Sequence, residues 1–229
     1  MRTYKQACGL AKTLDLVGDR WSLLIVRELL IRDACRYTDI RKSLPGIATN
    51  LLALRLRELE SAGILVREAA APPIATPLFR LTDRGRALEK AVLELGRWGS
   101  PLLTTPSRGD KLQAHWLVLP LKLYLRDLKP QEPKILINLR AGADPIAIEA
   151  SAGNIAVRLG VSEHPDALVK GKPETLLRLF TGRMSLGAAL AEGVQWEGNR
   201  EVLRRVVGTV DAPAPGANLM DSGAAGGVS

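Results

Sequence analysis

The chain has 229 residues, of which 46% are hydrophobic and 24% are charged, so it can build one large core or two small ones. Its apolar runs are far shorter than the roughly 18 residues that a membrane helix needs. The first residues also lack the apolar stretch of a signal peptide. We therefore expect a cytoplasmic protein with no membrane partner. Two cysteines, Cys8 and Cys35, are too few for a disulfide framework.

The positive charge is concentrated in the first half of the chain. The net formal charge is +8. Residues 1–106 carry 17 Lys and Arg against 11 Asp and Glu, whereas residues 107–229 carry 15 against 13. A cationic excess in one half is what binding to a polyanion requires. A solvated basic surface would have the same composition, so charge alone does not decide between the two interpretations.

Changes in composition predict three segments. Prolines and glycine interrupt the helical patterns from Pro101 to Asp110, which places a boundary between a first domain, residues 1–106, and a second, residues 107–208. Alanine, glycine and proline dominate the end of the chain, so we expect residues 209–229 to form a disordered tail.

The first domain is predicted to be mostly helical. Apolar spacing predicts helices over residues 10–17 and 21–31, with Asp19 as a cap between them. A short helix over residues 40–44 follows the cap-type residues Thr38 and Asp39 and stops at Pro45-Gly46. Strands are predicted over residues 64–67 and 78–81, and Asp83 opens a last long helix.

Between the short helix at residues 40–44 and the first predicted strand lies a longer helix with a buried leucine stripe. Thr49 can cap it, Leu52, Leu56 and Leu59 recur at helical spacing, and Gly63 ends it. A short helix, a tight turn and a longer helix, in this order, are typical of a helix-turn-helix. In that motif the second helix enters the major groove of DNA.

The outward residues of this second helix are the candidate DNA contacts. Asn50 can read adenine, and Arg57 can take guanine or a phosphate. Arg55 either reaches a phosphate or pairs with Glu58 or Glu60. The alternative is that these charges form only a solvated helix face. The candidates are Thr49, Asn50, Ala53, Leu54, Arg55 and Arg57.

Several motifs of this half resemble those of the HxlR family of winged-helix regulators. They are Cys8-Gly9-Leu10-Ala11, Gly18-Asp19-Arg20-Trp21, Leu44-Pro45-Gly46-Ile47, Arg55-Leu56-Arg57-Glu58-Leu59-Glu60 and Leu81-Thr82-Asp83-Arg84-Gly85. The resemblance covers roughly residues 7–104. It implies a winged helix-turn-helix that binds an inverted repeat in double-stranded DNA as a homodimer, with the first and last helices in the interface. The stripe of Leu88, Ala91, Val92, Leu95 and Trp98 fits that interface or an internal core.

The wing departs from the family pattern. The loop at residues 69–77 carries no charge, and Leu78-Phe79 stands where the family often has Glu-Tyr. A neutral wing cannot neutralise phosphates. Arg67 and Arg80, on the strands beside the loop, are the obvious cations near it.

The second domain has a mixed α/β pattern. A helical pattern covers residues 112–128, with Leu117, Leu121 and Leu125 on one side and a kink expected at Pro120. Strands are predicted over residues 135–139, 146–148, 155–159, 167–169 and 194–198, with later helices starting at Pro173, Ser185 and Asn199. The whole chain is therefore expected to belong to the α+β class.

Several motifs within residues 169–193 resemble the sterol carrier protein type two fold, and the resemblance covers about residues 112–207. The matching motifs are Val169-Lys170-Gly171-Lys172-Pro173, Leu179-Phe180-Thr181-Gly182-Arg183 and Glu192-Gly193. The resemblance implies a twisted sheet with helices over one face, enclosing a tunnel for lipids or other apolar molecules. It implies that Leu176, Phe180, Leu190 and Trp196 line this tunnel. The same side chains could equally fill a closed core.

No catalytic set emerges, and we expect neither an enzyme, nor a metal, nor a cofactor. His115 and His164 have no cysteine or carboxylate at ligand spacing, and no phosphate loop or dinucleotide motif is present. The family resemblance makes Cys8 a candidate redox sensor, because a helix N-terminus can favour its thiolate. Cys35, in an expected loop beside Arg32 and Arg36, has an electropositive setting. For both cysteines a plain structural role stays open.

The sequence thus predicts a DNA-binding regulator whose operator affinity responds to a small apolar ligand in the second domain. Two other functions remain open. One is a lipid-binding carrier, in which the basic half contacts a protein or a membrane. The other is a redox regulator in which Cys8 carries the signal.

Overall fold

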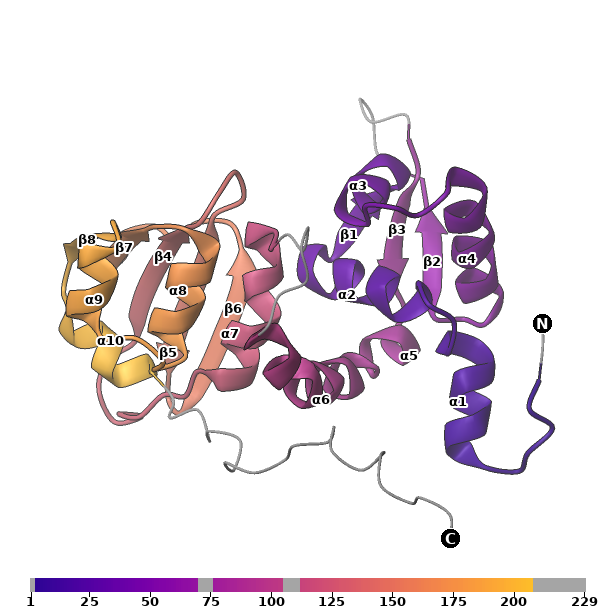
Figure 1. Cartoon of the computed structure of the whole chain (residues 1–229), viewed down its shortest axis with the longest axis horizontal. Helices are drawn as coiled ribbons and strands as arrows, with labels where there is room; N and C mark the ends of the chain where they lie inside the picture. Colours follow the sequence, from indigo (N-terminus) through magenta and orange to yellow (C-terminus); the bar gives the residue numbers. More distant parts are fainter. Residues whose placement is uncertain (1–2, 70–75, 105–111, 208–229) are drawn as a thin grey trace, which may run out of the picture.

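The computed structural model describes residues 3–69, 76–104 and 112–207 and shows two units, each with its own sheet (Figure 1). The first unit, here called the N-terminal domain, is mostly helical. The second, the C-terminal domain, is a sheet with helices. The expected α+β class is confirmed. The predicted boundary at residues 106 and 107, the tail at residues 209–229 and most of the wing loop lie outside the described residues.

The N-terminal domain has the expected order of helices followed by a hairpin. Its helices are α1 (Gly9–Val17), α2 (Ser22–Arg32), α3 (Tyr37–Ser43), α4 (Thr49–Ser61), α5 (Asp83–Arg86) and α6 (Glu89–Gly99), followed by the 3-10 helix η1 (Ser100–Thr104). Its strands are β1 (Ala34–Arg36), β2 (Leu65–Glu68) and β3 (Leu78–Leu81), in the antiparallel order β1-β3-β2. Strand β1 was not predicted, and it places Cys35 in a sheet instead of a loop.

Caps explain where several of these helices begin. Asp19 was expected to cap α2, but the N-cap residue is Trp21, and Asp19 Oδ1 instead accepts the N–H groups of Trp21 and of Ser22, the first helical residue. Helix α3 begins at Tyr37, before the predicted start, because the side chain of Asp39 accepts the N–H of Arg36. The predicted long helix from Asp83 is divided into α5 and α6.

The C-terminal domain has a five-stranded sheet. It contains the 3-10 helix η2 (Ala114–Leu117), helices α7 (Val118–Tyr124), α8 (Pro173–Phe180), α9 (Leu186–Ala191) and α10 (Glu201–Val206), and strands β4 (Ile135–Arg140), β5 (Ile146–Ser151), β6 (Asn154–Leu159), β7 (Ala167–Lys170) and β8 (Gln195–Gly198). The strand order is β6-β5-β4-β7-β8, and only the β4–β7 pair is parallel. Pro120 lies in the first turn of α7, where its missing N–H is tolerated, so the expected kink is not needed.

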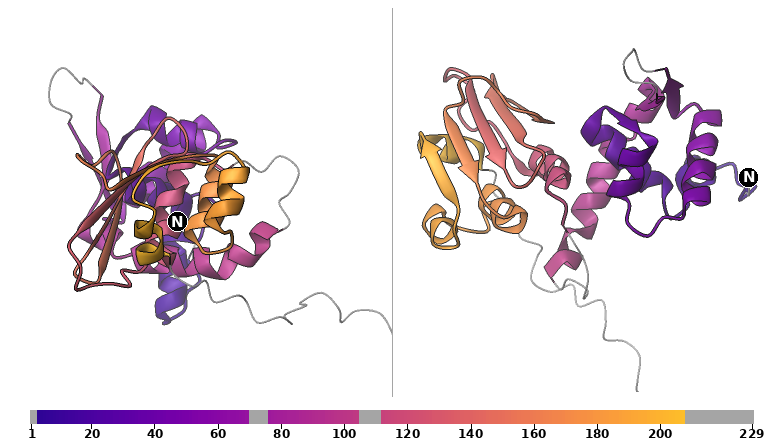
Figure 2. Two further views of the ribbon diagram at one scale, coloured as in Figure 1. Left: turned by 90° about the vertical axis from the view of Figure 1, so that its left-hand side faces the viewer. Right: turned by 90° about the horizontal axis from the view of Figure 1, so that it is seen from above.

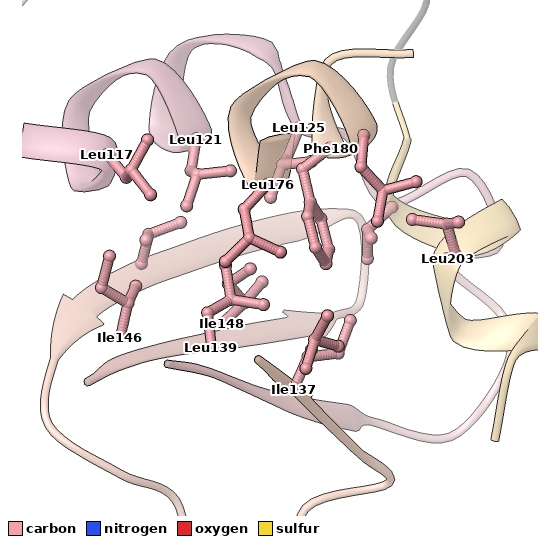
Figure 3. Close-up of a cluster of buried hydrophobic side chains, with 14 of the residues drawn as sticks. Leu117, Leu121, Leu125, Ile137, Leu139, Ile146, Ile148, Leu176, Phe180 and Leu203 are labelled. Atoms are coloured by element: carbon pink, nitrogen blue, oxygen red, sulfur yellow. The ribbon is translucent and has the colours of Figure 1, made fainter. Parts of the chain in front are cut away.

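One face of this sheet carries the core of the C-terminal domain. Ile137 and Leu139 of β4 and Ile146 and Ile148 of β5 are fully buried, because alternate residues of a strand face the same side. Helices α8, α9 and α10 lie over one face of the sheet (Figure 2). Leu117, Leu121, Leu125, Leu176, Phe180 and Leu203 point from the helical segments toward the strands (Figure 3).

The two domains meet along a contact that we call the seam, formed by α2, α3 and α6 on one side and by η2, α7 and the β4–β5 loop on the other. Helices α6 and α7 lie side by side there (Figure 1), and Lys122 Nζ donates to Glu89 Oε1 at 2.7 Å. Ile31 belongs to α2 but is buried in the C-terminal core. Across the described ranges, no helix is long and apolar enough to span a membrane.

Candidate nucleic-acid interface

Helix α4 divides cleanly into a buried and an exposed face. Leu52, Leu56 and Leu59 are at most 2% exposed, as the leucine stripe predicted. The opposite face carries Thr49, Asn50, Leu54 and Arg57, all exposed, and the half-buried Ala53. The structure therefore places these predicted base-contacting residues on the exposed side of one helix, from its first turn at Thr49 to its third turn at Arg57.

The turn before α4 differs from the prediction in one detail. The N-cap is Ala48 and Thr49 is the first helical residue, with no side-chain cap, so Thr49 is not the expected cap. Its carbonyl oxygen instead accepts a hydrogen bond of 2.7 Å from Tyr37 Oη at the start of α3. Gly46, with φ of +91°, supplies the left-handed turn between the two helices. Together these contacts hold α4 against the preceding helix.

The side chain of Arg55 forms ion pairs with two acidic residues of the same domain. Its guanidinium lies 3.1 Å from Asp19 Oδ1, before the start of α2, and also forms an ion pair with Glu58 one turn further along α4. Its side chain is only 25% exposed. The alternative interpretation of Arg55, pairing with Glu58, is therefore the arrangement found here. Arg57, by contrast, is exposed and has no ionic partner among the described residues.

The two arginines at the base of the wing also differ. Arg80 forms ion pairs with Asp33 and Glu68, and these bonds raise the pKa of its guanidinium. Asp33 also pairs with Arg86, and together the two arginines hold the pKa of this carboxyl below its usual range. Arg67 is exposed and has no acidic partner in the described part of the chain. The charge of Arg80 is thus largely neutralised within the protein.

Two further cations were missed by the sequence reasoning. Arg41 and Lys42, in the last turn of α3, are exposed, and neither has an ion pair within residues 3–69, 76–104 and 112–207. Their signal was available, since they come just before the Pro45-Gly46 turn of the helix-turn-helix. They add to the positive field beside α4.

The four predicted ligand-lining residues come from three elements of the C-terminal domain. Leu176 and Phe180 of α8 are buried in the core, and Leu190 of α9 is half-buried. Trp196 of β8 stacks on Phe180 with ring centroids 6.3 Å apart. Its Nε1 is buried and has no hydrogen-bond partner among the residues that the structure describes. The structure thus places Phe180 and Trp196 together and leaves one polar donor among apolar groups.

The two cysteines lie in opposite environments. Cys8 is exposed at the N-cap of α1, and the N–H groups of Ala11 and Leu10 lower the pKa of its thiol. Cys35 is 1% exposed, and burial raises the pKa of its thiol to about 12. The expected electropositive activation of Cys35 is therefore wrong, because loss of water outweighs the charge of Arg32.

No group of three or more potential metal ligands occurs in the portion that the structure describes. His164 is exposed, whereas His115 is buried beside Glu28 of α2. The sequence offered no hint of this pairing, because 87 residues separate the two side chains.

Comparisons with known proteins agree with this division into two domains. Residues 16–106 match the HxlR-like helix-turn-helix family, and residues 122–211 match the SCP-2 sterol transfer family. The chain is 34% identical to the HTH-type transcriptional regulator YdeP of Bacillus subtilis, over 48% of this chain and 82% of that protein. It is 36% identical to the HTH-type regulator YybR of the same organism, over 42% of this chain and 75% of that protein.

A similar solved structure is that of the redox regulator HypR in its reduced form, with 31% identity and a TM-score of 0.39, covering 43% of this chain and all of that one. The relatives match the N-terminal half, and the SCP-2 match covers most of the other half. The chain therefore belongs to the HxlR-like helix-turn-helix family of transcriptional regulators, and its C-terminal half matches the model of the SCP-2 sterol transfer family.

Proposed function

We propose that this protein is a dimeric transcriptional regulator that binds an inverted repeat through α4 and whose DNA affinity responds to an apolar ligand in the C-terminal domain. The observation that carries the DNA-binding part is the exposed face of α4. Arg57 is exposed there with no ionic partner in the part of the chain that the structure describes, two helical turns along from the exposed Asn50. A guanidinium and an amide on one exposed helix face are donors that can read guanine and adenine in the major groove.

The experiment on DNA binding is selection of bound duplexes from a random pool, followed by gel shift with variants. We expect Arg57→Ala to weaken binding to the selected sequence by about 1–3 kcal/mol, and Asn50→Ala to relax its specificity. Arg80→Ala is the matched control, because Asp33 and Glu68 already neutralise this arginine. If neither Arg57→Ala nor Asn50→Ala weakens specific binding, α4 is not the recognition helix.

Exposed apolar side chains support the homodimer. Leu10 of α1 is 67% exposed, and Leu95 and Trp98 of α6 are 52% and 78% exposed. Helix α6 contains no buried residue, although its apolar residues lie on one side. An apolar surface of this kind marks an interface. A dimer through α1 and α6 would present two copies of α4 to one duplex, about 34 Å apart for successive turns.

The ligand part of the proposal is supported by the SCP-2 match and by Trp196. The Nε1–H of this residue is buried without an acceptor, beside the ring of Phe180. An apolar molecule with one hydrogen-bond acceptor would satisfy it, since a buried unpaired donor is costly. Native mass spectrometry of the purified protein tests for such a molecule.

The coupling of the two parts is tested by adding that molecule to the gel shift. A ligand changes DNA affinity only if it binds one state of the protein more tightly than the other. Binding of the molecule with unchanged affinity for DNA would refute the coupling. Apolar ligand binding without any specific DNA binding would instead indicate a carrier protein.

One observation favours a second function, regulation by thiol oxidation. Cys8 is exposed, and the N-terminal N–H groups of α1 lower the pKa of its thiol. A thiolate is the reactive form. We expect iodoacetamide to modify Cys8 much faster than the buried Cys35. If complete alkylation of Cys8 leaves DNA affinity unchanged, this second function is excluded.

A further inference from the structure

A buried carboxylate lies at the seam between the two domains. Glu28 is on α2 of the N-terminal domain, and its side chain is fully buried. His115 Nε2 lies 2.8 Å from Glu28 Oε2, and Trp116 Nε1 donates to Glu28 Oε1 at 2.8 Å. Both donors belong to η2 of the C-terminal domain. Arg27, the neighbour of Glu28 on α2, donates to the same Oε1 from Nη2 at 2.7 Å.

The members of this cluster also hold one another in place. The guanidinium of Arg27 lies 4.1 Å from the ring centroid of Trp116, a cation–π contact. The rings of His115 and Trp116 meet edge to face, with centroids 5.8 Å apart. Burial opposes ionisation of Glu28, but the hydrogen bond from His115 and the charge of Arg27 keep the pKa of its carboxyl below the usual range. The carboxylate is therefore an anion whose compensating donors come from both domains.

This arrangement makes the cluster sensitive to the relative position of the domains. A buried charge is tolerated only when donors replace its lost water, and hydrogen bonds require donors within about 3 Å. If the C-terminal domain turned or withdrew, Glu28 would lose His115 and Trp116 together. Apolar packing between large surfaces can slide more easily, because it has no such directional requirement.

Other contacts at the seam reach the helix-turn-helix itself. Gln113 Nε2, just before η2, donates to the carbonyl oxygen of Ser43 at the end of α3, at 3.1 Å. Before the start of α2, Asp19 accepts the N–H groups of Trp21 and Ser22 and pairs with Arg55 of α4. Helix α2, with Glu28 in its middle, therefore connects the seam to the recognition helix through one rigid element.

We propose that Glu28, Arg27, His115 and Trp116 form an interdomain latch, which holds the C-terminal domain in one orientation and links its state to α2 and α4. The latch is independent of any ligand. Its regulatory use, transmission of a ligand signal to DNA affinity, rests on the proposed function. A physical link of this kind must be shown by coupling, because closeness in space alone does not show it.

The test is hydrogen exchange of the full-length protein, without DNA or ligand, for His115→Gln and Trp116→Phe. Both variants alter only the C-terminal side of the latch. We expect amide exchange to become at least about tenfold faster in the second half of α2, and measurably faster in α4. His164→Asn is the matched control, since it removes the other histidine from an exposed position whose φ of +49° suits asparagine.

Protection of β4 and β5 provides the check on folding, because these strands lie in the C-terminal core. With that protection retained in Trp116→Phe, unchanged exchange in α2 would overturn the latch. Faster exchange in α2 without any change in α4 would overturn the link to the recognition helix. These outcomes are read without DNA, so they stand even if the protein binds no specific sequence. Where an operator has been selected, an unchanged affinity in both variants would overturn the regulatory use alone.

Discussion

The N-terminal domain offers two surfaces for association, and they are built in opposite ways. At the seam, the charge of Glu28 is fully buried and surrounded by donors from the C-terminal domain. On α1 and α6, apolar side chains such as Leu10 and Trp98, respectively, remain exposed. A buried polar network demands one geometry, whereas an exposed apolar surface supplies binding energy with little directional demand. The comparison indicates an oriented contact within the chain and an exposed apolar surface that the proposed dimer would use.

The largest expected effect is the loss of stability in Glu28→Ala. Removing the carboxylate leaves Arg27, His115 and Trp116 without their shared acceptor, and breaking such a buried cluster costs about 3–5 kcal/mol. Urea denaturation measures this change in the free energy of unfolding. Glu201→Ala is the control, because Glu201 forms an exposed pair with Arg204 and should matter by less than about 0.5 kcal/mol. A cost below about 1 kcal/mol for Glu28→Ala would mean that the seam does not depend on its charge.

Next in size is the effect of a charge on the apolar surface. A buried aromatic residue at an interface contributes about 2 kcal/mol, so Trp98→Glu should weaken the proposed dimer about 30-fold. Sedimentation equilibrium measures the dissociation constant. Leu128→Glu alters a similarly exposed apolar residue in the C-terminal domain and should leave the dimer intact. Equal dissociation constants for wild type and Trp98→Glu would place the dimer interface elsewhere.

A smaller effect is expected from acid. The pKa of the Glu28 carboxyl is lower in the folded state than the usual value of about 4.3, so its ionised form stabilises the fold above that pH. This contribution is lost as the pH falls through the folded-state pKa. The difference in unfolding free energy between wild type and Glu28→Gln should therefore shrink on acidification below about pH 4. A difference that is constant with pH would show that the ionised state contributes nothing.

The smallest effect belongs to the edge of the seam. Arg32 Nη2 donates to Asp144 Oδ2 at 2.7 Å, and the two side chains are 24% and 41% exposed. Such a partly solvated pair contributes about 0–1 kcal/mol, and less at high salt. We expect Arg32→Gln to lower the free energy of unfolding within that range, and the loss to decrease in 1 M NaCl. A loss as large as that of Glu28→Ala would mean that the edge, and not the buried cluster, holds the domains together.

Much of the fold could be predicted from periodicity, because periodicity reports burial within one element. The stripe of Leu52, Leu56 and Leu59 predicted the buried face of α4, and the apolar runs at residues 135–139 and 146–148 predicted strands β4 and β5. Local caps were harder to assign. Thr49 was expected to cap α4, but the N-cap is Ala48. Whether a side chain makes a capping hydrogen bond depends on the backbone path in the folded protein, and helix ends are uncertain by one or two residues.

The charged residues could be predicted least. Arg57 and Arg55 lie two residues apart on one helix, but only Arg55 meets Asp19, which is distant in sequence. Arg80 was expected to contact DNA. It instead forms ion pairs with Asp33, which precedes β1, and with Glu68 of β2. Glu28 was not singled out from the sequence, because its donors His115 and Trp116 come from the other domain. Pairing between distant charges requires the three-dimensional fold and leaves no periodic trace.

The position of Ile31 has a practical consequence for dissecting this protein. This α2 residue is 6% exposed only because the C-terminal core covers it, and the α6 residues Val92 and Leu93 pack against the same core. A fragment that ends after η1 would expose these apolar side chains. It would also leave the carboxylate of Glu28 without its donors from the C-terminal domain. Such a fragment should self-associate or precipitate, and its behaviour would say little about the intact molecule. Replacing Ile31 with a polar residue, together with Glu28→Gln, would give a shorter version better suited to work in isolation.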